Sequence, residues 1–155
     1  MSKLGSHVHE LALASLRKSN GASNGALEGV LRLFAKWRSQ LLQNTLIQKH
    51  GTTVHQGLLS GLKFLDHSSE GCHVAKLLGT YEQPLQGPLE RLLNKGKYRK
   101  LLNIGCAEGY YAVGLARKMP QVTSFAYDTD PHAREACKNL AIRNGVEDRV
   151  IIDKL

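Results

Sequence analysis

A turn with two glycines, set between an apolar run and a helical segment, constrains this chain more than any other feature. Residues 101–104 read Leu-Leu-Asn-Ile, which is typical of a short strand buried in a parallel sheet. Gly105 and Gly109 lie in the turn that follows, and residues 110–119 have the apolar spacing of a helix. The free N–H groups of that helix would point at the turn. This order predicts one unit of a parallel α/β sheet.

An acid follows the next predicted strand, which covers residues 122–127. At the position of Asp128, an acid in a strand–helix–strand unit accepts hydrogen bonds from ribose hydroxyls. The small residues of the turn would let a ligand approach the main chain closely. Together these features predict a pocket for a cofactor that carries a nucleoside.

The spacing of the glycines separates two kinds of cofactor. A dinucleotide fingerprint needs glycine at the first, third and sixth positions, where this chain has Gly105, Ala107 and Tyr110. The bulky Tyr110 opposes close packing of the helix. Glycines at the first, third and fifth positions correspond to Gly105, Ala107 and Gly109, where Ala is a mild departure. The spacing therefore favours S-adenosylmethionine over a dinucleotide.

The segment after Asp128 has clear helix boundaries. Asp130 is a suitable N-cap, Pro131 suits the first helical position, and Asn144-Gly145 ends the helix. Residues 150–152 then begin a third strand. We therefore predict the α/β fold class, with an incomplete Rossmann-like sheet of parallel strands and helices that follows a mostly helical N-terminal extension.

Residues 101–109 and 125–131 together resemble the first two motifs of class I S-adenosylmethionine-dependent methyltransferases. Residues 104–111, Ile-Gly-Cys-Ala-Glu-Gly-Tyr-Tyr, and 126–131, Ala-Tyr-Asp-Thr-Asp-Pro, are most similar to the FkbM-type branch. The preceding Gly79-Thr80-Tyr81-Glu82 fits that branch too. The resemblance covers residues 79–152, which is under half of the chain.

This resemblance implies an S-adenosylmethionine pocket and assigns residues to it. The residues expected at the methionine end of the cofactor are Gly105, Cys106, Ala107 and Gly109. Asp128 would hold the ribose hydroxyls, and Thr129 would lie beside the adenosine. Glu82 would reach the cofactor or the substrate, or would serve only as a carboxylate at a helix start. Asn103 departs from the family, which often has Asp there, because its amide keeps an acceptor oxygen but lacks the charge that attracts the cofactor's ammonium group.

The family's complete sheet has further strands, and its adenine-binding and catalytic segments follow the strand at 150–152. We therefore expect a truncated domain, either the front part of a longer protein or a fragment that needs a partner, and we name no catalytic residue. In the family's strand order, the strand at 101–104 would become an exposed apolar edge. Such an edge invites pairing with another chain, so we expect self-association or pairing with a missing C-terminal portion.

The net charge of +8 is concentrated in the first part of the chain. Residues 1–100 hold 14 Lys and Arg against 6 Asp and Glu, whereas residues 101–155 hold 7 of each. The basic part would suit nucleic acid, anionic lipid or an acidic glycan. Because few aromatic residues are interleaved with the charges, an ordinary solvated surface is the favoured interpretation.

Composition also indicates the cellular compartment of the protein. The hydrophobic content of 42% predicts a packed core, and no apolar run approaches the length of a membrane span. The N-terminus lacks the core of a signal peptide. Cys72, Cys106 and Cys137 make no obvious disulfide framework, which favours reduced thiols and a cytoplasmic protein.

The N-terminal part is predicted to be mostly helical. A short first helix ends near Asn20-Gly21, Asn24 is the predicted cap of a second helix, and Gly51 is its predicted end. An apolar stripe along the second helix favours a packing or dimer helix over a membrane-surface helix.

Residues 52–54 and 62–65 are predicted short strands, and a helix is predicted to begin near Pro84 and end at Gly96. The chain is accordingly divided into a helical extension over residues 1–78 and a partial S-adenosylmethionine-binding domain over residues 79–155.

The sequence thus predicts an S-adenosylmethionine-dependent methyltransferase that acts on an oxygen or nitrogen of an unidentified small-molecule or glycan acceptor. The alternatives are a cofactor-binding or scaffold module without turnover, a nucleotide-dependent oxidoreductase, and a nucleic-acid-binding domain. The pairs His7–His9 and Cys72–His73 match no standard metal spacing, so no metal centre is predicted. Glu108 adjoins the glycines, but we assign it no catalytic role.

Overall fold

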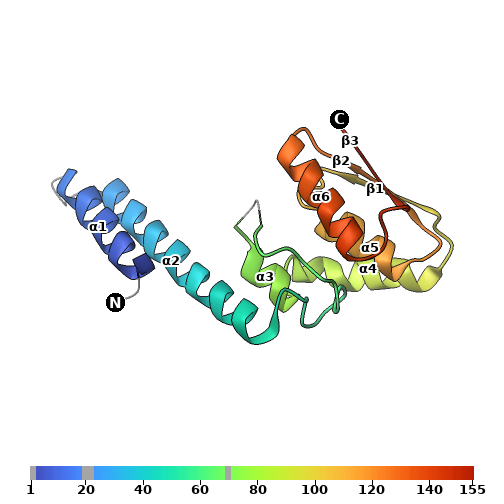
Figure 1. Cartoon of the computed structure of the whole chain (residues 1–155), viewed down its shortest axis with the longest axis horizontal. Helices are drawn as coiled ribbons and strands as arrows, with labels where there is room; N and C mark the ends of the chain where they lie inside the picture. The colour runs from blue at the N-terminus through green and yellow to red at the C-terminus, as the bar shows by residue number, and fades with distance from the viewer. Residues whose placement is uncertain (1–2, 19–22, 69–70) are drawn as a thin grey trace. The chain divides into compact units, whose positions relative to one another are not determined.

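A computed structural model describes residues 3–18, 23–68 and 71–155 (Figure 1). The chain forms two compact units, Met1–Gln48 and Lys49–Leu155. The sequence-based boundary lay at 78/79, whereas residues 49–78 here belong to the same unit as the sheet. In the described part of the chain, no helix is both long enough and apolar enough to cross a membrane.

The first unit consists of α1, Lys3–Lys18, and most of α2, Asn24–His50. Ser23 rather than Asn24 caps α2, because its Oγ accepts a hydrogen bond from the N–H of Ala26 at 3.2 Å. The apolar stripe of α2 is largely exposed, as Leu31 at 68% shows. The predicted end of the first helix at Asn20-Gly21 lies outside the described residues.

The second unit begins with a compact loop region that sequence reasoning only partly anticipated. Residues 52–54 and 62–65 approach each other, but they form a single antiparallel bridge, Thr53↔Lys63, rather than two strands. Phe64 and Leu77 are fully buried there and contribute to the core of this unit. The short helix α3, His73–Leu78, was not predicted from the sequence.

The remaining elements alternate as expected for an α/β fold. They are α4 (Gln83–Lys95), β1 (Lys100–Ile104), α5 (Tyr110–Lys118), β2 (Thr123–Tyr127), α6 (Pro131–Arg143) and β3 (Val150–Asp153). The strands are parallel and lie in the order β1-β2-β3 (Figure 1). Asp130 caps α6 as predicted, since its Oδ1 accepts a hydrogen bond from the N–H of His132 at 2.9 Å. The predicted fold class is therefore confirmed.

The two faces of the sheet differ in burial. Ser124 and Ala126 alternate onto one face of β2, Val150 pairs with Ser124, and all three are buried. The helices α5 and α6 cover one face of the sheet (Figure 1). The pairing register puts Leu102 and Ile151 level with each other on the opposite face, where they are 62% and 49% exposed. Within residues 71–155, β1 has β2 as its strand neighbour on one side and an apolar edge on the other, as the sequence predicted.

Candidate functional site

The glycine turn after β1 is fixed to the end of β2 by its main chain. The N–H groups of Gly105 and Cys106 both donate to the carbonyl oxygen of Tyr127, at 2.8 and 2.9 Å. Gly109 closes the turn by donating to the carbonyl of Cys106 at 2.8 Å. Gly105 and Gly109 have φ angles of 71° and 89°, so both occupy the left-handed region that favours glycine. The turn therefore has one defined shape at the carboxyl end of the sheet.

A cavity of about 260 Å³ opens beside this turn. It is lined by Lys76, Tyr81, Glu82, Asn103, Gly105, Cys106, Ala107, Tyr110 and Tyr111. Five of these residues were assigned to a cofactor from the sequence, namely Glu82, Asn103, Gly105, Cys106 and Ala107. A Cβ atom built on Gly105 would meet no atom within 4 Å, so the main chain at this point borders open space. A ligand could therefore lie directly against the backbone of the turn.

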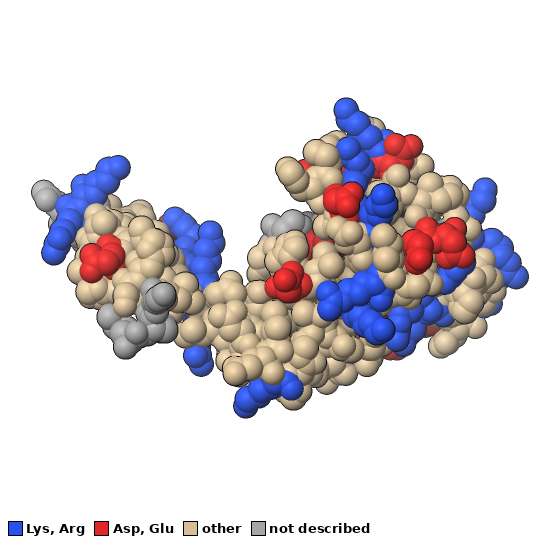
Figure 2. Space-filling view, in the orientation of Figure 1, with Lys and Arg blue, Asp and Glu red and all other residues tan. Residues whose placement is uncertain are grey.

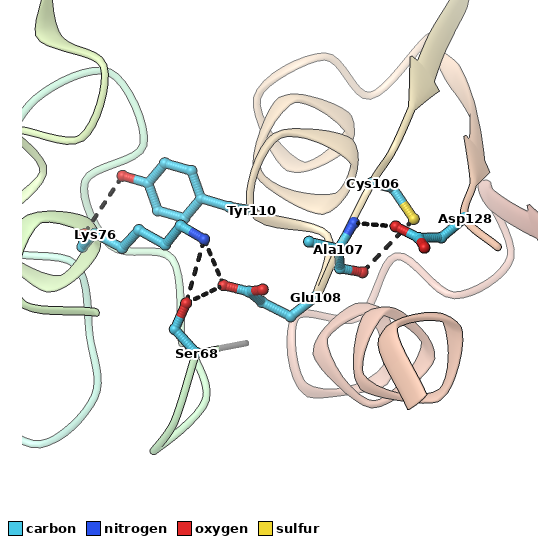
Figure 3. Close-up of polar contacts among 7 residues, drawn as sticks. All are labelled: Ser68, Lys76, Cys106, Ala107, Glu108, Tyr110 and Asp128. Atoms are coloured by element: carbon cyan, nitrogen blue, oxygen red, sulfur yellow. Dashed lines mark hydrogen bonds and ion pairs between the residues drawn. The ribbon is translucent and has the colours of Figure 1, made fainter. Parts of the chain in front are cut away.

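Asp128 is joined to the turn through its side chain. Its Oδ2 accepts a hydrogen bond from the N–H of Ala107 at 2.9 Å (Figure 3). Its Oδ1 accepts one from the N–H of Asp130 at 2.9 Å. Each carboxylate oxygen retains further acceptor capacity, because an ionised carboxylate offers about four lone-pair sites. The acid is thus held at a fixed place beside the turn and can still accept hydrogen bonds from a ligand.

Like Asp128, the predicted residues Gly109 and Thr129 are not among the residues that line the cavity. Gly109 is buried against α6, because a Cβ atom at that position would stand 2.5 Å from the Sγ of Cys137. Thr129 is exposed, and its carbonyl accepts a hydrogen bond from Arg134 at 3.0 Å. Gly109 therefore allows close helix packing, a role that its neighbours in sequence could not reveal.

Two residues of the cavity wall have a strained backbone. Glu82 and Ala107, with φ angles of 45° and 47°, are the non-glycine residues in the left-handed region among those that the structure describes. A side chain in this region costs roughly 1–2 kcal/mol. Such strain often marks functional sites, and both instances here face the same cavity.

A buried ion pair closes the side of the turn opposite Asp128. Lys76 Nζ lies 2.6 Å from Glu108 Oε1, and both side chains are 2% exposed (Figure 3). The hydroxyl of Ser68 donates to the same oxygen at 2.7 Å. Sequence reasoning missed this network, since Lys76 lies on the unpredicted α3 and nothing local links it to Glu108. Its burial makes Glu108 a structural anchor of the turn.

Aromatic rings surround the ammonium group of Lys76. It lies 4.8 Å from the ring centroid of Tyr81 and 5.9 Å from that of Tyr110, within range of cation–π attraction. Burial raises the pKa of Tyr110 to about 12. Burial, together with the nearby carboxylate of Glu82, also raises the pKa of Tyr111. Both phenols are therefore protonated at neutral pH and can donate hydrogen bonds.

Possible metal ligands were sought among the described residues. They contain no group of three or more His, Cys, Asp or Glu side chains that could hold a metal ion. His73, half of the Cys72–His73 pair, is 3% exposed and packs edge-on against Phe64 at a centroid distance of 5.5 Å. It is a core residue in this structure.

Comparison with known proteins gives little further identification. No family model matches the chain, and no curated protein matches it. Among solved structures, an O-methyltransferase family protein from Burkholderia thailandensis is similar, with 17% sequence identity and a TM-score of 0.39. The match covers 77% of this chain and 37% of that one, so the chain spans little more than a third of that structure's length. The function therefore has to be argued from the cavity itself.

Proposed function

We propose that this chain binds S-adenosylmethionine in the cavity beside the glycine turn and belongs to a methyltransferase that transfers a methyl group to an oxygen or nitrogen acceptor. The observation that carries this proposal is the convergence of Asn103, the turn at 105–107 and Glu82 on one cavity of about 260 Å³. Asp128, which is hydrogen-bonded to Ala107, stands next to it.

The chemistry of the wall suits the parts of this cofactor. Asn103 and Glu82 supply an amide oxygen and a carboxylate for an ammonium group. The main chain of Gly105 leaves room for a ligand at van der Waals distance. Asp128 is the acceptor for ribose hydroxyls, and we keep Thr129, at the exposed end of β2, as the neighbour of the adenosine. When bound, the cofactor supplies an activated methyl group, and the protein's part is to hold and align it.

The packing of the turn favours this cofactor over a dinucleotide. In the dinucleotide fingerprint, the sixth position needs glycine for close packing of helix and strand. Here the close contact is made by Gly109, the fifth position, against Cys137. Tyr110, the sixth, is buried among Phe64 and Tyr81, with ring centroids at 5.5 and 5.6 Å.

A cofactor-binding module without turnover is the second candidate. Within residues 71–155, Leu102 and Ile104 are 62% and 63% exposed. Parallel sheets normally have both faces covered, so this exposed face favours the second candidate. Such a module would bind the cofactor and depend on a partner for transfer. We assign the pocket, and not a catalytic residue, to this chain.

The face of residues 49–155 that Figure 2 shows gives no comparable support for nucleic-acid binding. On the face shown in Figure 2, Lys and Arg of residues 49–155 are interspersed with Asp and Glu. A nucleic-acid site would instead present a continuous basic stripe.

Isothermal titration with S-adenosylhomocysteine and with NAD tests the proposal. We expect the former to bind and the variant Asp128→Ala to bind it at least tenfold more weakly, because hydrogen bonds to a charged acceptor contribute on the order of 1.5–3 kcal/mol each. Asp148→Ala, at an exposed position, is the matched control and should bind like the unaltered chain. The absence of heat with S-adenosylhomocysteine at millimolar concentration, or tighter binding of NAD, would exclude the proposal.

A further inference from the structure

Arg134 lies in the first turn of α6 and reaches back to the end of β2. Its Nη1 atom donates hydrogen bonds to the carbonyl oxygens of Asp128 and Thr129, at 2.8 and 3.0 Å. The main-chain N–H of Arg134 donates to the carbonyl oxygen of Asp130 at 3.1 Å. One arginine therefore holds the carbonyls of residues 128–130, the segment that follows β2.

The same segment carries the acid that stands beside the cavity. The carboxylate of Asp128 accepts hydrogen bonds from the N–H groups of Ala107 and Asp130, both at 2.9 Å. Ala107 lines the cavity and has a left-handed backbone with a φ of 47°. Hydrogen bonds therefore connect α6, through the end of β2, to the cavity wall.

We propose that Arg134 is a positioning residue, which fixes the main chain at residues 128–129 so that the carboxylate of Asp128 can accept hydrogen bonds from the ribose of a bound ligand. This inference rests on the proposed function, which gives Asp128 that role. The two N–H groups of Nη1 are both used on main-chain carbonyls. This nitrogen therefore acts on the place of Asp128 and not on the ligand.

The other restraints on this segment are weaker. The N–H of Asp128 donates to the carbonyl of Asp153 on β3 at 3.3 Å, which is long for a hydrogen bond of this kind. Thr129 is exposed to solvent. Without Arg134, the carbonyls of residues 128 and 129 would bond to water and the segment could turn. An acceptor whose support is lost has to be ordered again on binding, and that ordering lowers the affinity.

Arg149 provides a matched control. Its Nη1 atom also holds main-chain carbonyls, those of Ala116, Met119 and Val122, at 2.9, 3.2 and 3.1 Å. None of these three residues lines the cavity beside the glycine turn. The variant Arg149→Met therefore loses hydrogen bonds of the same kind and leaves the segment at Asp128 as it is.

Titration of the full chain with S-adenosylhomocysteine and with its 2′-deoxy analogue tests the proposal. We expect Arg134→Met to bind S-adenosylhomocysteine about tenfold more weakly, within the range of coupling in one hydrogen-bonded network, and to lose much of the preference for it over the analogue. Arg149→Met should keep both the affinity and the preference. A loss in Arg134→Met that is equal for the two ligands would mean that Arg134 does not act through the ribose acceptor, and would overturn the proposal.

A double-mutant cycle tests the route of the effect. If Arg134 acts through Asp128, the variant Asp128→Ala/Arg134→Met should bind S-adenosylhomocysteine as weakly as Asp128→Ala alone. Losses that add in the double variant would show that the two residues act independently and would overturn the proposal.

Hydrogen exchange of the Ala107 amide, followed by NMR, tests the same support without a ligand. We expect faster exchange in Arg134→Met than in the unaltered chain, because the carboxylate that accepts this N–H is no longer held, and no change in Arg149→Met. Equal exchange in all three chains would overturn the positioning role. If the unaltered chain does not bind S-adenosylhomocysteine, the proposed function fails, while the exchange rates still decide whether Arg134 holds Asp128. Arg134→Gln replaces Arg134→Met in these measurements if the latter does not fold.

Discussion

The two sides of the glycine turn are held by different kinds of interaction. Toward α3, Glu108 forms a fully buried ion pair with Lys76 that Ser68 supports (Figure 3). Toward β2 and α6, the turn is held by Asp128, a half-buried carboxylate, and by the close contact of Gly109 with Cys137. One side depends on buried charge and the other on shape and main-chain hydrogen bonds.

This difference implies different tolerances. A buried charge that loses the opposite charge beside it is strongly destabilising. A single substitution on the α3 side should therefore lower the free energy of unfolding by a large amount. On the β2 side, the loss in the free energy of unfolding should scale with the strain or the contact that a substitution alters, because the interactions there are local and partly solvated. Four predictions test this contrast.

The largest effect is expected at the ion pair. Lys76→Met should lower the free energy of unfolding by about 3–5 kcal/mol, because it removes the positive charge that balances the buried carboxylate of Glu108. Urea denaturation measures this loss. The double variant Lys76→Met/Glu108→Leu is the matched control, and it should recover most of the stability, since a buried pair can be replaced by apolar residues. A double variant as unstable as the single one would show that the ion pair does not anchor the turn.

A smaller loss is expected at Gly109. Gly109→Ala would put a Cβ atom 2.5 Å from the Sγ of Cys137 at a φ of 89°, so strain and overpacking together should cost about 2–3 kcal/mol. Gly105→Ala has a comparable φ of 71° but meets nothing within 4 Å, so it should cost only about 1 kcal/mol. Thermal and urea unfolding compare the two variants, and equal losses would mean that contact with α6 contributes nothing.

The α3 side should also carry a pH dependence through His73. Burial lowers the pKa of His73, although the carboxylate of Glu108 partly opposes this effect. The unfolded chain takes up a proton on this residue near pH 6.5 and the folded chain does so only at lower pH. Stability is therefore fully present above about pH 6.5 and falls as the pH drops toward the folded pKa, by at most about 1.4 kcal/mol per pH unit.

His73→Phe should remove this part of the pH dependence, because the ring stays in place beside Phe64 but no longer titrates. Urea unfolding of both chains at pH 7.5 and pH 5.5 measures the difference. If the two chains lose the same stability on acidification, the remaining histidines and carboxylates account for it and His73 does not.

The smallest effect is expected at Ala107, where the two sides meet. Ala107→Gly should raise the free energy of unfolding by up to about 1 kcal/mol, because glycine adopts a φ of 47° without the steric cost of a Cβ atom. The hydrogen bond from its N–H to Asp128 should persist. Differential scanning calorimetry measures the gain, and a lower melting temperature would show that this residue is not strained.

Local sequence signals determined the regular part of this protein. Strands, helices and caps from α4 to β3 were predictable because each depends on residues close in the chain, such as Asp130 at the start of α6 and Gly96 at the end of α4. The same order of elements predicted that the glycine turn and Asp128 lie at one end of the sheet, since a parallel unit brings its first turn and the end of its second strand together. The apolar edge of β1 within residues 71–155 was expected from the strand order of the family that the sequence resembles.

Only the tertiary structure decided what holds the turn. Lys76 and Glu108 pair across distant segments, and no local pattern records that contact. The same is true of Gly109, whose need for glycine comes from a sulfur atom on another helix. Sequence periodicity reports which side of an element is apolar, whereas the partner that a buried charge or thiol meets depends on how separate elements pack against each other.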